Sequence, residues 1–337
     1  MTSKKKMLIC GGTGFIGRNL IEYFLRQKEY QITATHWTRP IPRELQGVGM
    51  DWVRADLRDP QAVDRIVQGQ NIILQAAATT SGAKDILERP YLHVTDNAVM
   101  NSYLLRAAHD QGCEHFVFFS CTVMYNDSKS NVVEEDLDYQ LTKKYFGVGW
   151  TKVYIEKMCE FFAQLGRTRF TAIRHSNIYG PHDKFDLERS HVFGATVTKV
   201  MQATDQIIVW GEGTEERDLL YVDDLSAFVD AALHKQTSSY ETVNVGLGKS
   251  ISIRRLVEKI IQHSQKNIRI AHDLSKPSIP FKLSMDIQKA NRVFGWQPRV
   301  SLDEGVQKTL EWYKSNHTHG SNHSSGRKRD EAQVPSA

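Results

Sequence analysis

The stretch KMLICGGTGFIG, residues 6–17, decides the fold of this chain. Its apolar first half is continuous, which is typical of a parallel strand covered on both faces. The glycines lead into residues 15–27, where apolar side chains recur at helical spacing. The order of strand, glycine turn and helix predicts the first unit of a parallel α/β sheet.

The glycines of this turn have the spacing of a dinucleotide site. Gly11, Gly14 and Gly17 fit the pattern G-x-x-G-x-x-G. The first two let the backbone turn tightly and approach a pyrophosphate, and the third lets the helix pack closely on the strand. Amide groups at the helix N-terminus can then donate to the phosphates. The residues expected to bind the dinucleotide here are Gly11, Thr13, Gly14, Phe15, Ile16 and Gly17.

Strand and helix patterns continue to alternate along the first half of the chain. Four further apolar runs, which we expect to be strands, lie at residues 30–37, 50–59, 70–78 and 115–123. This alternation predicts an α/β fold with a doubly wound parallel sheet of the Rossmann type, followed by a smaller C-terminal substrate-binding lobe. We assign residues 1–180 mainly to the cofactor domain, to which later segments return, and residues 181–315 mainly to the lobe. Residues 316–337 lose their apolar side chains and are predicted to form a disordered tail.

Composition narrows the class of protein. Apolar residues make up 40% and charged residues 24% of the 337 residues, and the net charge of +4 is too small to indicate a nucleic-acid partner. The cysteines form no C-x-x-C pair, so neither a metal site nor a disulfide framework is predicted. Two of them, Cys10 and Cys113, are expected to be buried. Without a signal peptide or an apolar run near the ~18 residues of a membrane span, we expect a cytoplasmic protein.

The end of the second predicted strand bears on the choice between NAD and NADP. A carboxylate there would hold the ribose hydroxyls, but the sequence is THWTRP, residues 35–40. Arg39 could instead pair with a 2′-phosphate, since a guanidinium suits phosphate geometry, which favours NADP. The alternative is that Arg39 is only a surface charge. Asp56 and Leu57 are expected beside the adenine, and the small residues Ala76, Ala77 and Ala78 would let the ribose pass over them.

Four segments together carry a family resemblance: GGTGFIG (11–17), NIYGPHDKFD (177–186), WGEGTEERDLLYVDD (210–224) and NVGLG (244–248). Over roughly residues 6–315 the chain resembles the extended short-chain dehydrogenases/reductases that act on nucleotide sugars, and among them the GDP-fucose synthases. The resemblance implies an NADP-dependent epimerase or reductase acting on a GDP-linked 4-keto-6-deoxy sugar, with a role in polysaccharide biosynthesis.

The catalytic residues of that family carry over unevenly. Its lysine, which holds the nicotinamide ribose, matches Lys152, but Val148 stands at the position of its tyrosine. The position of its serine falls on Cys121, with Ser120 and Thr122 beside it. The cysteine that serves as the epimerisation base falls on Val123, whereas its histidine partner is retained as His191 at the start of a predicted helix.

Because valine cannot give a proton, another group must serve if the chain catalyses reduction. Tyr145 lies two helical turns before Lys152, about 10 Å along the axis. Cys121 could act as an acid or base, with its thiol pKa lowered by the neighbouring lysine, or it could simply fill the space of the serine. The candidate catalytic residues are therefore Lys152, Cys121, Thr122, His191 and Tyr145.

The resemblance also implies a substrate site. Arg217 and Lys282 match basic groups that hold the sugar diphosphate, and Asn177 matches an asparagine near the nicotinamide and the sugar. The implied substrate-binding residues are Asn177, His191, Val192, Trp210, Arg217 and Lys282. A homodimer is implied through the helix that contains Lys152 and a helix over residues 97–108. The alternative function is a non-catalytic paralogue that binds cofactor and sugar nucleotide and acts as a partner or regulator.

Overall fold

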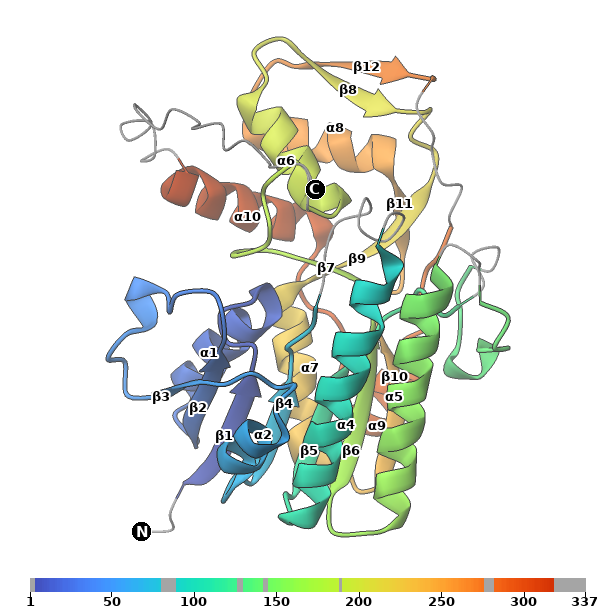
Figure 1. The fold of residues 1–337 in the computed structure, drawn as a ribbon. Helices are drawn as coiled ribbons and strands as arrows, with labels where there is room; N and C mark the ends of the chain where they lie inside the picture. The colour runs from blue at the N-terminus through green and yellow to red at the C-terminus, as the bar shows by residue number, and fades with distance from the viewer. Residues whose placement is uncertain are drawn as a thin grey trace, which may run out of the picture.

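A computed structural model describes residues 4–79, 89–125, 130–141, 145–187, 190–275 and 282–317 (Figure 1). The predicted doubly wound sheet is confirmed: seven parallel strands lie in the order β10-β6-β5-β4-β1-β2-β3. Their bounds are β1 Lys5–Cys10, β2 Tyr30–His36, β3 Asp51–Arg54, β4 Ile72–Gln75, β5 His115–Phe119, β6 Arg169–His175 and β10 Tyr240–Val245.

Helices cover both faces of this sheet. Their bounds are α1 Phe15–Gln27, α2 Pro60–Val67, α4 Thr95–Asp110, α5 Phe146–Gln164, α7 Val222–Lys235 and α9 Gln288–Phe294. Strand β1 shows why two layers form, because Met7 and Ile9 join one buried cluster while Leu8 and Cys10 join the other. The first cluster contains residues of α1, α7 and α9, and the second contains residues of α2, α4 and α5.

Two strands of the sheet come from segments that the sequence patterns did not assign to it. Strand β6 pairs with β5 through Phe170 and Phe116, and β10 pairs with β6 through Val243 and Ile173. The apolar run of β6 is interrupted by arginine and threonine, so it lacks the pattern of a buried strand. Its Arg174 is nevertheless buried, because it pairs with Glu156 of α5.

The smaller lobe lies beyond the carboxyl ends of the parallel strands (Figure 1). Its elements are β7 Asn177–Tyr179, α6 Val192–Gln202, β8 Gln206–Trp210, β9 Glu216–Tyr221, β11 Ser250–Ser252, α8 Ile253–Ser264, β12 Arg269–Asp273 and α10 Leu302–His317. The short 3-10 helices are η1 Arg43–Leu45, η2 Pro90–His93 and η3 Glu134–Asp136. Ser252 caps α8, since its side chain accepts a hydrogen bond from the amide of Arg255. Most of the predicted tail, residues 318–337, lies outside the described residues.

A buried carboxylate joins several segments at the base of the lobe. Asp218 of β9 accepts hydrogen bonds from the amides of Leu247, Gly248 and Met285, at 2.8, 3.1 and 3.3 Å. Burial raises the pKa of Asp218 to about 6. A Cβ on Gly246 would come within 3.0 Å of the carboxylate oxygens. The NVGLG motif is thus explained by a turn that wraps around Asp218.

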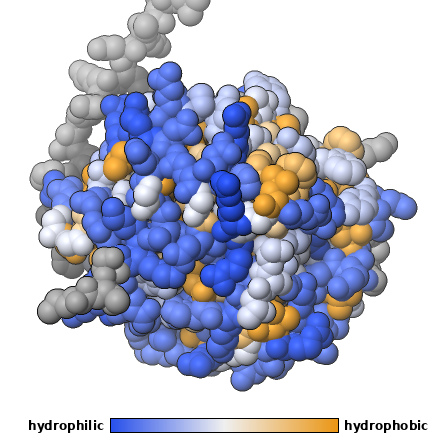
Figure 2. All heavy atoms as spheres, turned by 90° about the horizontal axis from the view of Figure 1, so that it is seen from below, coloured by the Kyte–Doolittle hydropathy of each residue, from blue (hydrophilic) through white to orange (hydrophobic). Residues whose placement is uncertain are grey.

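Among the helices that the structure describes, none has the length and apolar character needed to cross a membrane. The face at the amino ends of the strands, seen from below in Figure 2, is dominated by hydrophilic side chains with small apolar groups between them.

Candidate active site

The glycine turn between β1 and α1 is built for close approach of a ligand backbone. Gly11 has φ +77°, and a Cβ there would lie 2.7 Å from the Cα of Ala77. A Cβ on Gly17 would lie 2.3 Å from the carbonyl oxygen of Gly11, so only glycine lets α1 start this close to the turn. Helix α1 has no side-chain cap at Gly14 and no acidic residue in its first turn. The helix N-terminus therefore fits a diphosphate.

The adenosine end of the expected cofactor site lies beyond β2. Thr35 ties this strand to the glycine turn, because its hydroxyl and carbonyl oxygens accept hydrogen bonds from the amides of Gly11 and Gly12 at 3.0 and 2.9 Å. Arg39 is exposed just after the strand. Asp56 accepts two hydrogen bonds of 2.9 Å from the Arg58 guanidinium, which lowers the pKa of its carboxyl group. Leu57 is buried.

Lys152 sits on the inner side of α5 at the carboxyl end of β5. Its ammonium group donates to the carbonyl oxygen of Phe119 at 2.7 Å and lies 4.7 Å from the centre of the Phe118 ring. Burial lowers the pKa of Lys152, an effect that the nearby Cys121 and Glu156 oppose. The lysine is thus held by the end of the neighbouring strand.

One helical turn further, a buried ion pair fixes α5 to the sheet. The Arg174 guanidinium meets the Glu156 carboxylate at 2.7 Å, and it also donates to the Tyr125 hydroxyl and to the Glu134 carbonyl, both at 2.9 Å. The Tyr125 hydroxyl in turn donates to Asn244 of β10 at 2.6 Å. This network joins α5, β6 and β10 directly behind Lys152.

Cys121 follows β5 and is the half-buried member of the four cysteines; the other three, Cys10, Cys113 and Cys159, are fully buried. The prediction for Cys10 and Cys113 is therefore confirmed. The predicted direction of the thiol pKa was wrong: burial raises the pKa of Cys121, and the opposing charge of Lys152 is the smaller effect. The thiol is protonated at neutral pH. Its neighbour Thr122 is buried.

His175 is a site residue that the sequence analysis missed, because β6 itself was not recognised. It is the last residue of that strand, and its Nδ1 lies 2.8 Å from the carbonyl oxygen of Ser176. A carbonyl only accepts, so Nδ1 carries the proton and Nε2 presents a lone pair. Burial lowers the pKa of His175 to about 4, assisted by the charges of Lys152 and His191. His175 is therefore an electrostatic neighbour of both.

His191 and Tyr145 occupy helix starts. His191 is the N-cap of α6, as predicted, and its side chain remains exposed. Although part of its surface is open to solvent, desolvation by the surrounding protein, with the charge of Lys184, lowers the pKa of His191. Tyr145 is the N-cap of α5 rather than part of the helix, so the two-turn spacing from Lys152 does not apply. Tyr145 acts electrostatically on Arg217, a residue of the opposite lobe.

The predicted substrate residues lie along the lobe. Arg217 of β9 is half-buried, and burial lowers its pKa. Lys282 is exposed and pairs with Glu216, the residue before Arg217, at 2.9 Å. Asn177 of β7 donates to the carbonyl oxygen of Asp218 at 3.2 Å. Arg217, Lys282 and Asn177 therefore all lie at β9 or at the neighbouring strand β7.

Trp210 and Val192 lie further out in the lobe. Trp210 ends β8 with 53% of its surface exposed, and Val192 is the first residue of α6. Lys199 of α6 places its ammonium group 5.7 Å from the centre of a Trp210 ring. The sequence analysis missed Lys199, because a lysine within a predicted helix does not by itself indicate a binding role. A cation over an exposed ring is suited to a nucleotide base and its phosphates.

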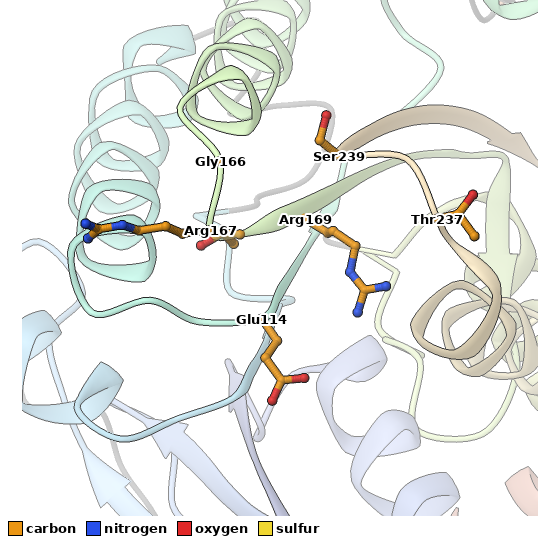
Figure 3. Close-up of a pocket in the computed structure, with 7 residues that line it drawn as sticks. Glu114, Gly166, Arg167, Arg169, Thr237 and Ser239 are labelled. Atoms are coloured by element: carbon orange, nitrogen blue, oxygen red, sulfur yellow. The ribbon is translucent and has the colours of Figure 1, made fainter.

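A separate hollow of ≈ 340 Å³ lies at the opposite, amino end of the strands (Figure 3). Its lining residues are Glu114, Gly166, Arg167, Thr168, Arg169, Thr237 and Ser239. The Arg167 and Arg169 side chains point apart in Figure 3, and Arg169 donates to the carbonyl oxygen of Gln236 at 2.8 Å. The hollow therefore lies apart from the chemistry at Lys152. Within the described residues, no three histidine, cysteine or acidic side chains are grouped to hold a metal ion.

Comparison with known proteins decides the family. The model of the NAD dependent epimerase/dehydratase family matches residues 7–246, well over half of the chain. The chain belongs to this family. The predicted family resemblance is thereby confirmed, and with it the prediction of an enzyme of this class.

Curated relatives of this epimerase/dehydratase span nearly its whole length. It is 27% identical to a GDP-L-fucose synthase of Azorhizobium caulinodans, covering 93% of this chain and 97% of the relative. It is 24% identical to a GDP-L-colitose synthase of Yersinia pseudotuberculosis, covering 91% and 97%. A dTDP-4-dehydro-6-deoxy-D-allose reductase of a Streptomyces species is 28% identical, covering 92% and 96%.

Solved structures share the fold of the family. A UDP-glucose 4-epimerase of Thermotoga maritima, solved with UDP-glucose, superposes with a TM-score of 0.81 at 22% identity, covering 92% of this chain and 99% of that one. A UDP-glucose 4-epimerase of Thermus thermophilus, solved with NAD, has a TM-score of 0.78 at 21% identity, covering 92% and 99%.

Proposed function

We propose that this family member is an NADP-dependent reductase, with or without epimerase activity, of a GDP-linked 4-keto-6-deoxy sugar. The relatives named for GDP-L-fucose, GDP-L-colitose and a dTDP-linked 4-dehydro-6-deoxy sugar support this substrate class. A bound NADPH would supply the hydride. The glycine turn would hold its diphosphate, Arg39 its 2′-phosphate and Lys152 its nicotinamide ribose.

The observation that carries this proposal is the electrostatic coupling of Cys121 with Lys152 at the end of β5. Reduction turns the sugar C4 carbonyl oxygen into an alkoxide, which must take up a proton. Val148 offers none. The Cys121 thiol keeps its proton at neutral pH because burial raises its pKa. It would pass this proton to the alkoxide, and the ammonium group of Lys152 would stabilise the thiolate that remains.

Inversion at a carbon next to the C4 carbonyl is a second activity, which His191 supports. Such a step needs a base that removes the proton from carbon. His191 is exposed at the start of α6, and its lowered pKa keeps it neutral and able to accept that proton. Val123 stands where the family has its second epimerisation group, so inversion at a single carbon is favoured over a double inversion.

The lobe would hold the nucleotide part of the substrate. Arg217 and Lys282, on either side of Glu216, would contact the diphosphate. Lys282 presents a point charge where the resembling family has an arginine fork. Trp210 with Lys199 would take the base. The alternative function, a binding paralogue without activity, rests on the loss of the family's tyrosine at Val148, together with the changes at Cys121 and Val123.

One experiment separates these functions. The protein is incubated with NADPH and GDP-4-keto-6-deoxymannose in deuterated water, following nicotinamide absorbance and deuterium uptake into the sugar. Loss of NADPH supports the reductase, and deuterium uptake without oxidation supports an epimerase alone. Tight binding of both ligands with neither change supports the binding paralogue.

Two variants test the role of the thiol. Cys121→Ala should lower the rate of NADPH oxidation by about 10²-fold or more, the usual worth of a general acid. Cys113→Ala, which removes a buried thiol away from Lys152, is the matched control and should retain the rate. Unchanged turnover in Cys121→Ala would exclude the thiol as proton donor while leaving the reductase function intact.

We also propose that the protein is a homodimer. Helix α5 and its C-cap residue expose large apolar side chains: Phe146, Trp150, Tyr154, Phe161 and the C-cap Leu165 have 57, 37, 51, 55 and 51% of their surface accessible. Their spacing places them along one side of the helix. A row of large apolar side chains on a helix is suited to pairing with a second copy.

A further inference from the structure

An arginine and a tryptophan form an isolated pair at the cofactor edge of the sheet. Arg54 ends β3, and its guanidinium carbon lies 4.9 Å from the centre of a ring of Trp37, the first residue after β2. The two strands run parallel, with His36 opposite Arg54. Their carboxyl ends therefore present Trp37 and Arg54 at the same edge as the glycine turn.

The pair lies where the adenosine half of a dinucleotide would be bound. Thr35, two residues before Trp37, accepts hydrogen bonds from the glycine turn itself. In folds of this type, the residue that reads the ribose 2′ position follows the second strand. Residues 36–40 contain no carboxylate, and Asp56, which follows β3, is occupied by Arg58.

The chemistry of the pair suits a phosphate monoester. Within the described part of the chain, no hydrogen bond or ion pair is formed by the Arg54 guanidinium. Stacking on an aromatic face leaves the edge of the guanidinium, with its N–H donors, available for bidentate contact with phosphate. It also holds the long side chain in place, which reduces the entropy lost on binding. The 42% exposure of Trp37 leaves surface for the adenine.

We propose that Arg54, positioned by Trp37, is a cofactor-specificity residue that binds the 2′-phosphate of NADP together with Arg39. This rests on the proposed function only in that a dinucleotide occupies the glycine turn. A nucleotide without the 2′-phosphate would gain nothing from Arg54, so the pair would separate NADP from NAD.

The test is direct binding, measured by calorimetry with the full chain, of 2′,5′-ADP and of 5′-AMP. The two probes differ only in the 2′-phosphate. Arg54→Gln should weaken 2′,5′-ADP binding by about ten- to a hundredfold, as expected for loss of a charged hydrogen-bonding partner. It should leave 5′-AMP binding within about twofold. Trp37→Leu, which keeps the charge but removes the support, should weaken 2′,5′-ADP by a smaller factor.

Arg26→Gln is the matched control, because Arg26 lies 5.9 Å from the centre of the Tyr23 ring, on the helix that follows the glycine turn, but outside the β2–β3 edge. It should change neither affinity. Equal affinities of wild type and Arg54→Gln for 2′,5′-ADP would overturn the proposal. So would a parallel loss for both probes. If the wild type bound neither probe, the nucleotide site itself would be refuted, and both proposals would fall together.

Discussion

At the scale of single residues, the proposed chemistry depends on a thiol beside a lysine. Two effects act on Cys121: burial raises its pKa, and the charge of Lys152 lowers it. The effect of burial on the pKa is the larger of the two. A protonated thiol next to an ammonium group resembles a phenol next to one, since both are neutral acids whose anions the cation stabilises. In the proposed reductase, Cys121 and Lys152 would thus perform the task that a tyrosine and a lysine perform in the family that the chain resembles.

This leads to a prediction for alkylation. Because the thiolate is the nucleophile, labelling of Cys121 by iodoacetamide should be slow at pH 7 and rise with a midpoint above the ~8.5 of a free thiol. Lys152→Met should move that midpoint higher still, since it removes the favourable charge. Mass spectrometry of labelled peptides measures both. A midpoint below 8 in the wild type, or no shift in the variant, would contradict this account.

A second residue prediction concerns acid stability. Burial lowers the pKa of His115 to about 3. Its Nε2 pairs with the Thr171 hydroxyl at 2.8 Å, while its Nδ1 has no partner among the described residues. In the unfolded chain the pKa would be about 6.5, so the unfolded state takes up a proton first as the pH falls. The contribution of His115 is complete above pH 6.5 and is lost progressively below it.

His115→Asn should therefore show a smaller fall in the free energy of unfolding than wild type between pH 7 and pH 5, by about 2 kcal/mol. Urea titrations at the two pH values measure it. The comparison must be between variants, because Asp218, whose pKa burial raises, changes stability with the opposite sign in this range. The exposed His317, changed to Asn, is the control and should follow the wild type.

Candidate site residues that lie in local motifs could be proposed from the sequence, whereas candidates defined by contacts between elements could not. Gly11, Lys152 and Arg217 lie in continuous patterns with a readable function. The roles proposed for Arg54 and Lys199 depend on an aromatic ring from another element that lies against each of them. No pattern in the sequence indicates that a cationic side chain will contact an aromatic ring from another element.

At the scale of elements, α5 is positioned by a charge pair inside the protein. Glu156 and Arg174 are both buried, and their contact links the helix to β6. The pair also explains why β6 was not predicted. An arginine interrupts the apolar pattern of the strand, and it can be buried only because Glu156, eighteen residues earlier, neutralises its charge. An apolar pattern can be recognised within one segment, but a buried charge that is neutralised by a residue of another segment can be recognised only when both segments are considered together.

Removing one partner should therefore be costly. Glu156→Gln leaves a buried guanidinium without its counter-charge, which should lower the free energy of unfolding by about 3–5 kcal/mol. Glu160→Gln is the matched control on the same helix. Its exposed pair with Lys157, at 2.8 Å, should contribute less than about 1 kcal/mol. Urea unfolding measures both, and similar losses in the two variants would show that the buried pair does not anchor α5.

At the scale of the whole molecule, the exposed side of α5 predicts the assembly state. Light scattering should give twice the chain mass of 38.5 kDa. Phe161→Glu should convert the protein to monomers, because it places a charge within the row of apolar side chains. Leu274→Glu changes a residue that is also exposed, on the far lobe, and should leave the mass unchanged. A monomeric wild type would refute the dimer.

The order of strands in the main sheet has a consequence for synthesis. Strand β6 has β5 on one side, and its other side is filled by β10, which is made some seventy residues later, after the first half of the lobe elements. Helix α9 arrives later still. A chain emerging from the ribosome must therefore hold an unpaired strand edge until residues 240–245 appear. Open edges attract other strands, so truncated or stalled chains should depend on chaperones, and the two lobes cannot be exchanged between relatives by a single crossover.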